Sequence, residues 1–197
     1  VLLMIDLKGV RVGFVMTGSF CTFAEAFTAA EALRQAGASL LPVMSEHAAG
    51  TDTRFGSALS HIQRLEAICE KPVIRSIPEA EPIGPKHMTD ILVVAPCTGN
   101  TLAKLAASIT DTTATMAVKS HLRTGNPVVL AVATNDALAG SAKNIGQLLN
   151  LKHYRFVPFG QDQPTGKPTS LIADFTKIPQ TLADALDGKQ QQPILLS

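Results

Sequence analysis

Short apolar runs alternate along this chain with longer segments in which apolar residues recur at helical spacing. The runs are rich in β-branched side chains and are bounded by glycine, proline or polar residues, which is typical of strands covered on both faces of a parallel sheet. They predict strands at residues 10–16, 39–44, 73–77, 90–95, 127–133 and 154–158.

The segments between these runs predict helices. In one of them, Leu59, Ile62 and Leu65 recur every three residues and share one helical face. We expect Gly37 to cap the first helix in the left-handed conformation, and Pro179 to kink or split the last one. The first helix is expected to end at Gln35, and the others to cover residues 54–70, 102–107, 113–123, 137–151 and 173–186.

This alternation of strands and helices predicts an α/β fold. Because crossovers between parallel strands are right-handed, we expect a three-layer, doubly wound parallel sheet of the flavodoxin-like or Rossmann-like kind. Residues 1–197 are expected to form a single domain with a closing C-terminal helix. Prolines and glycines in residues 160–170 predict a long loop or arm that contacts a partner or a ligand.

Ligands bind such sheets at the carboxyl ends of the strands, and the loop after the strand at 90–95 is a candidate. Pro96 leads into Thr98, Gly99, Asn100 and Thr101, which open a predicted helix. The unpaired amides and the dipole of a helix N-terminus favour a phosphate or a carboxylate there. The alternative is a capped turn that binds nothing.

A second candidate is the loop after the first strand. In it, Gly18 lies between the hydroxyls of Thr17 and Ser19, an arrangement suited to a phosphate. The dinucleotide spacing G-x-G-x-x-G and the P-loop spacing G-x-x-x-x-G-K-[ST] are both missing from the sequence, which argues against nucleotide binding of those kinds. An N-cap with a tight turn is the alternative interpretation.

Two cations are candidate carboxylate contacts. Arg54 is expected to begin a helix, where the dipole disfavours a cation unless an anion is near. A surface pair with Asp52 is the alternative for Arg54, and solvation is the alternative for Lys104. His47 lies beside the predicted pocket as a proton carrier or an ordinary loop histidine.

The composition argues for an oligomer and against several classes of ligand. Hydrophobic residues make up 46% and charged residues 17% of the 197 residues, which predicts that partner subunits cover part of the surface in a homo-oligomer. A net charge of +1 without a basic stripe argues against nucleic acid. The three cysteines and five histidines lack metal-ligand spacing, so no metal is expected. With no membrane-length apolar run and no signal peptide, we expect a cytoplasmic protein.

Residues 95–101, followed by residues 102–106 and 110–111, resemble the PASANT region of the flavoprotein family. That family includes phosphopantothenoylcysteine decarboxylase, epidermin-type cysteine decarboxylases and flavin prenyltransferase. The resemblance implies FMN, or another phosphate or anion, with Thr17, Gly18, Ser19 and Ser45 at the phosphate positions. Asn135 matches the last residue of the decarboxylases' P-A-M-N motif, whereas residues 80–85 lack the histidine of their H-I-x-L motif.

Within that family, the segments 51–56, 80–86, 98–100, 134–138 and 157–162 resemble the B subunits of bacterial dipicolinate synthases. The resemblance implies a sporulation enzyme in the mother-cell cytoplasm. With the NAD(P)-binding A subunit of dipicolinate synthase, it would oxidise dihydrodipicolinate to pyridine-2,6-dicarboxylate. Arg54, Lys104 and the loop 98–101 would then bind this small dicarboxylate, and Asn135 would orient its ring. The alternatives are an FMN-dependent decarboxylase or prenyltransferase, and a non-catalytic chain that completes the site of the A subunit.

Overall fold

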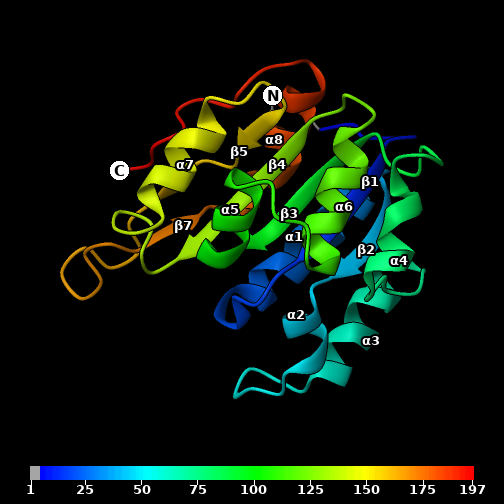
Figure 1. Ribbon diagram of the computed structural model, residues 1–197, viewed down its shortest axis with the longest axis horizontal. Coiled ribbons are helices and arrows are strands. Elements are labelled where there is room, and N and C mark those ends of the chain that lie inside the picture. Colours follow the sequence, from blue (N-terminus) through cyan, green and yellow to red (C-terminus); the bar gives the residue numbers. More distant parts are fainter. Residues whose placement is uncertain (1–4) are drawn as a thin grey trace.

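A seven-stranded sheet runs through the computed structural model, which describes residues 5–197 (Figure 1). Its strands are β1 (Arg11–Met16), β2 (Ser39–Met44), β3 (Ile91–Cys97), β4 (Val128–Thr134), β5 (Tyr154–Phe156), β6 (Phe159–Gly160) and β7 (Leu171–Ala173). The order is β2-β1-β3-β4-β7-β6, with β5 also paired to β4. The strands from β1 to β5 pair in parallel, whereas β7 runs antiparallel to both β4 and β6.

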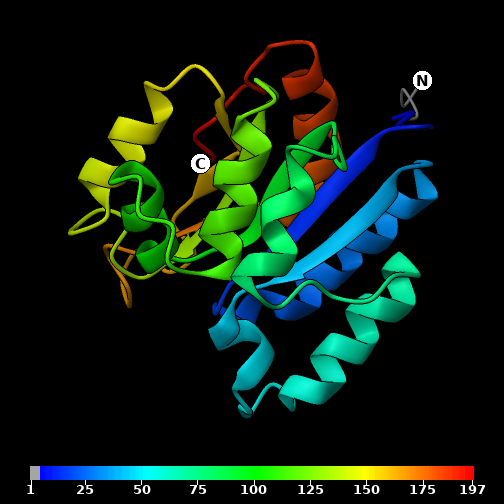
Figure 2. The same ribbon diagram turned by 45° about the vertical axis from the view of Figure 1, so that its right-hand side comes forward.

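Helices cover both faces of the sheet. They are α1 (Phe23–Gln35), α2 (Glu46–Gly50), α3 (Ala58–Cys69), α4 (Ile77–Ala80), α5 (Gly99–Ala106), α6 (Thr113–Leu122), α7 (Ala142–Leu149) and α8 (Ile178–Leu186). Helices α5, α6 and α7 lie on one face and α1 and α8 on the other, with α3 packed against α1 (Figures 1 and 2). The expected three-layer α/β fold is therefore confirmed, with a sheet that is mixed rather than wholly parallel.

The central strands carry the core. Every residue of β3 is buried, and β4 is buried up to Ala133, because helices close the sheet on both sides. Val93 and Leu130, for example, expose none of their surface. Burial of a side chain of this kind stabilises the fold by about 1.5–3 kcal/mol, so these two strands hold the loops that follow them in fixed positions.

The predictions for Gly37 and Pro179 have different outcomes. Gly37 follows α1 with φ +93°, which confirms the left-handed cap. Pro179 neither kinks nor splits the last helix, because it lies in the first turn of α8, where the missing amide hydrogen is not needed.

The predicted strand at 73–77 is wrong apart from Ile74, which forms one parallel bridge to Val43 of β2. Ser76 is the reason. It begins a capping box with Glu79, so that α4 starts where the strand was expected to end.

Several boundaries also differ from those expected. Helix α3 begins at Ala58 rather than at residue 54, because the Ser57 hydroxyl caps it and residues 53–56, within the connection 51–57, form a tight turn. Helix α7 begins at Ala142 rather than at residue 137. The short strands β6 and β7 were not predicted, and the exposed arm at 160–170 connects them. No helix within residues 5–197 is long and apolar enough to cross a membrane.

Candidate functional site

The first and third strands are tied together at their carboxyl ends by Thr17. Its hydroxyl donates to the Pro96 carbonyl at 2.7 Å and accepts from the Thr98 amide at 3.1 Å. Its own amide also donates to the Pro96 carbonyl at 3.2 Å, and only 1% of the residue is exposed. Thr17 therefore fixes the two loops to each other, and its hydroxyl is already engaged on both sides.

The side chain of His47, from α2, packs against the loop after β1. A Cβ atom added to Gly18 would collide with the His47 ring, so glycine at this position lets the imidazole lie against the backbone. The ring is exposed, packs edge-on against Phe20 with centroids 5.4 Å apart, and places Nδ1 3.2 Å from the Thr51 hydroxyl. Ser45 is buried, and its hydroxyl accepts from the Ala48 amide at 3.2 Å as the N-cap of α2.

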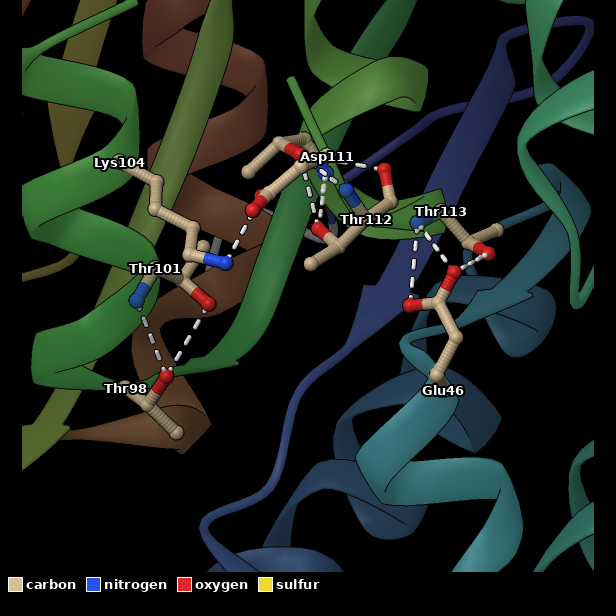
Figure 3. A network of polar contacts seen from close by, with 8 residues as sticks. Glu46, Thr98, Thr101, Lys104, Asp111, Thr112 and Thr113 are labelled. Carbon is tan, nitrogen blue, oxygen red and sulfur yellow. Dashed lines mark hydrogen bonds and ion pairs between the residues drawn. The ribbon is translucent and has the colours of Figure 1, made fainter. Parts of the chain in front are cut away.

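Figure 3 shows the start of α5 and its surroundings. The Thr98 hydroxyl caps the helix by accepting from the Thr101 amide at 3.2 Å, and it donates to the Thr101 hydroxyl at 3.0 Å. Lys104, one turn further along, reaches Asp111 at 2.7 Å. This contact holds the pKa of the Asp111 carboxyl below its usual value. Lys104 thus lies in the last turn of α5, where a cation is favoured by the helix dipole, with an exposed acid as its present partner.

Across from α5, the turn after β4 forms a small polar cluster. Asp136 accepts hydrogen bonds from the hydroxyls of Thr134 at 2.7 Å and Ser141 at 2.8 Å. These bonds, with that of Thr134 the larger influence, lower the pKa of Asp136. A Cβ atom on Gly99 would lie 2.7–2.9 Å from oxygens of all three residues, so only glycine lets α5 approach this cluster.

The cluster and α5 form the walls of an open groove of about 910 Å³, which we call the edge groove. It is lined by Thr98, Gly99, Asn100, Ala103, Lys104, Ala107, Ile109, Thr134, Asp136, Gly140, Ser141, Lys143 and Asn144. Two lysines and the amides of a helix N-terminus favour an anion there, whereas Asp136 opposes one. The groove therefore suits an anionic group held at its Lys104 side.

The structure places the other predicted residues elsewhere along the sheet edge. Arg54 does not begin a helix, because α3 starts at Ala58, so the dipole argument for a bound anion is wrong. Instead, the exposed Arg54 guanidinium stacks on the Phe55 ring, 4.9 Å from its centroid. Asp52 caps the amide of Ala58 at 2.8 Å. Asn135 is exposed, and its carbonyl accepts from the Thr169 hydroxyl at 2.6 Å, which ties the arm to the β4–α7 turn.

Sequence reasoning missed two contributors to this edge. Ser141 follows the β4 turn and completes the cluster around Asp136, and Glu46 holds the start of α6. The Glu46 carboxylate accepts from the Thr113 amide and hydroxyl at 2.9 and 2.7 Å, as Figure 3 shows. A signal was present in Glu46, which lies two residues after a buried strand, but its partner lies 67 residues further along the chain.

An FMN phosphate at the positions implied by the resemblance would need free donors and free space. The Thr17 and Ser45 hydroxyls already serve the backbone, and the His47 ring fills the space beside Gly18. This conformation therefore does not fit the phosphate, and FMN is accommodated only if His47 turns away. Within residues 5–197, no group of three or more His, Cys, Asp or Glu side chains is placed to hold a metal ion.

Known proteins resemble this chain closely. The Flavoprotein family pattern matches residues 4–184. The B subunit of dipicolinate synthase from Bacillus subtilis (strain 168) is 43% identical over 193 residues, which are 98% of this chain and 96% of that protein. The crystal structure of the dipicolinate synthase B subunit from Bacillus halodurans C superposes with a TM-score of 0.90 at 42% identity, covering 98% of both chains.

A more distant structure shares the fold. The FMN-dependent cysteine decarboxylase SpaF superposes with a TM-score of 0.67 at 24% identity, covering 91% of this chain and 99% of SpaF. On the sequence match and the close structural match, the chain belongs to the flavoprotein family and, within it, to the group of dipicolinate synthase B subunits.

Proposed function

We propose that the chain acts as the B subunit of a dipicolinate synthase, together with an NAD(P)-binding A subunit. The reaction removes a hydride and a proton from dihydrodipicolinate and yields aromatic pyridine-2,6-dicarboxylate, with NAD(P) on the A subunit accepting the hydride. The observation that carries this proposal is the 43% identity to a dipicolinate synthase B subunit over nearly the full length of both chains. Aromatisation makes the oxidation favourable, so the protein's main contribution is geometry and electrostatics.

The edge groove supplies the part of the site that holds negative charge. Lys104 can exchange its exposed partner Asp111 for a carboxylate or phosphate, because the Asp111 side chain is 60% exposed and loses little on release. Arg54 and Asn135 remain predicted contacts of the dicarboxylate, since both are exposed at the same edge of the sheet.

Turnover of dihydrodipicolinate by the A subunit alone, by this chain alone and by the two together tests the proposal. We expect activity only from the pair, and we expect Lys104→Gln to raise KM for the dicarboxylate about tenfold through loss of a charge-assisted contact. Lys152→Gln is the matched control, because this exposed lysine lies before β5 at the opposite edge of the sheet. Full activity of the A subunit alone would refute a catalytic role for this chain.

The engaged hydroxyls favour one second candidate, a non-catalytic chain that completes the site of the A subunit. In that case the A subunit alone binds substrate and turns it over slowly, and this chain raises the rate without binding the acid. An FMN-dependent decarboxylase or prenyltransferase would instead show a flavin absorption spectrum in the purified protein.

We also propose a homo-oligomer. The composition supports this, because 46% of the residues are hydrophobic and only 17% are charged, which is thin in surface charge for a chain that exposes its whole surface. Light scattering on the purified chain tests this, and a monomer at all concentrations would refute it.

A further inference from the structure

A pocket lined by phenylalanines lies between α1 and α3, next to the loop that ends β1. Its volume is about 240 Å³, below the 300–1,000 Å³ that is typical of sites for drug-sized ligands, so it is sized for a single ring. We call it the phenylalanine pocket. It is lined by Phe20, Cys21, Phe23, Ala24, Phe27, Phe55, Ser60, His61 and Arg64. Half of the chain's eight phenylalanines therefore converge here, at the same sheet edge as the edge groove.

A buried histidine in this pocket lacks a polar partner. His61 is 6% exposed and its ring lies 4.9 Å from the Phe23 ring and 6.0 Å from the Phe27 ring, measured between centroids. Its Nε2 atom is buried without a hydrogen-bond partner in the part of the chain that the structure describes. Buried polar atoms are nearly always paired in folded proteins, so this nitrogen is available to a polar group that enters the pocket.

The backbone is shaped to admit this ring. Gly56 has φ +138°, which other residues rarely adopt, and a Cβ atom there would lie 2.8 Å from the Cε1 atom of His61. The glycine thus lets the turn at 51–57 close over the imidazole. Burial, and secondarily the nearby Arg64, lowers the pKa of His61, so the ring is neutral and carries one donor and one acceptor nitrogen.

Arg64 supplies a positive charge beside the pocket that can pair with a carboxylate. Its guanidinium lies 4.6 Å from the centroid of Phe27, and its acidic neighbour Glu31 is 3.7 Å away, too far for a hydrogen bond. The side chain is half-exposed, so its planar fork of donors is available to a carboxylate. At the mouth, Phe55 is 46% exposed, and its ring is stacked with the Arg54 guanidinium.

We infer that the phenylalanine pocket binds a planar, single-ring aromatic carboxylate, with the ring against Phe20 and Phe55, the two lining phenylalanines whose side chains are not buried, and the carboxylate on the Arg64 guanidinium. Aromatic faces favour a flat π-system over a puckered ring, and the guanidinium pairs with a carboxylate in two parallel hydrogen bonds. The inference rests on the proposed function only for the identity of the acid, a pyridine dicarboxylate.

Calorimetric titration of the full chain tests the inference with three probes: pyridine-2,6-dicarboxylate, benzoate and cyclohexanecarboxylate. We expect both aromatic acids to bind more tightly than the saturated one. Arg64→Gln should weaken binding of the aromatic acids about tenfold or more. Arg75→Gln is the matched control, because it removes the same charge from an exposed position outside the pocket.

Phe55→Ala provides a second variant that removes little from the core, since the side chain is nearly half-exposed. It should reduce the preference for aromatic over saturated acids, with a melting temperature close to that of the unmodified chain. Equal binding of benzoate and cyclohexanecarboxylate, or equal affinities of the Arg64 and Arg75 variants, would overturn the inference.

The same samples separate this inference from the proposed function. If the A subunit and this chain together oxidise dihydrodipicolinate while Arg64→Gln leaves acid binding unchanged, the pocket assignment fails and the function stands. If the chain binds aromatic acids through Arg64 while the pair shows no oxidation, the proposed function fails and the pocket stands.

Discussion

Replacing Gly99 with alanine tests how closely α5 is held against the turn after β4. The added Cβ would lie 2.7 Å from the Thr134 hydroxyl, 2.8 Å from the Ser141 hydroxyl and 2.9 Å from the Asp136 carboxylate. Real Cβ atoms essentially never approach other atoms this closely. Each of these side chains is short and hydrogen-bonded within the cluster, so none can turn away without breaking a bond to Asp136.

The expected cost follows from these contacts. Overpacking a well-packed site costs about 1–3 kcal/mol, whereas alanine in place of glycine in a helix gains at most about 1 kcal/mol. Because Gly99 is the first residue of α5, the gain there is smaller still, and the clash decides the sign. A loss of 1 kcal/mol lowers Tm by about 2–4 °C in a chain of this size, so we expect a fall of roughly 2–12 °C.

Gly146→Ala is the matched control. Gly146 lies within α7, is exposed, and has nothing within 4 Å of its Cβ position. The same substitution there should raise the free energy of unfolding by about 0.5–1 kcal/mol. Thermal and urea unfolding of both variants measure the difference. If Gly99→Ala is as stable as the unmodified chain, the close approach of α5 to the Asp136 cluster is refuted.

Three further predictions concern single side chains. His47→Ala should strengthen FMN binding, because it clears the space beside Gly18; equal flavin quenching by both proteins would contradict this. Burial lowers the pKa of His121 below its ordinary value of 6.5, so as the pH falls the unfolded chain binds a proton at this histidine before the folded chain does. Urea unfolding should therefore show stability falling below about pH 6.5, less steeply in His121→Gln. Glu46→Gln should cost about 0.3–1 kcal/mol by removing the charge that caps α6 at Thr113, and an unchanged Tm would argue against this cap.

The central strands could be predicted from the sequence because burial on both faces leaves an unbroken apolar run. The run at 90–95 becomes β3, Ile91–Cys97, and the run at 127–133 becomes β4, Val128–Thr134. The strands β6 and β7 have two and three residues, too few to show a pattern. They form through antiparallel pairing of β7 with β4 and β6 and through a parallel bridge from Phe159 to Leu195. Their pairing turns an expected parallel sheet into a mixed one.

The candidate site, too, could be predicted from the sequence only in part. Topology alone predicts which loops meet, because the carboxyl ends of parallel strands share one edge. It does not predict which polar groups remain free, since this depends on partners far apart in the sequence. The Thr17 hydroxyl and the Pro96 carbonyl are separated by 79 residues, and their bond engages a hydroxyl that the loop pattern had assigned to a phosphate.

The hydroxyls at the strand ends therefore mainly hold the backbone in place. We expect cations on the helices to bind the anion. Thr17, Thr98 and Ser45 cap helices or join loops. Lys104 and Arg64, by contrast, pair with exposed acids, at 2.7 Å and at the longer distance of 3.7 Å, and Arg64 also stacks on the Phe27 ring. A charge released from a weak surface pair costs little, whereas a buried hydroxyl withdrawn from the backbone leaves unpaired groups behind. An incoming carboxylate is thus expected to engage one of these cations, Lys104 in the edge groove or Arg64 in the phenylalanine pocket, before it disturbs any strand-end hydroxyl.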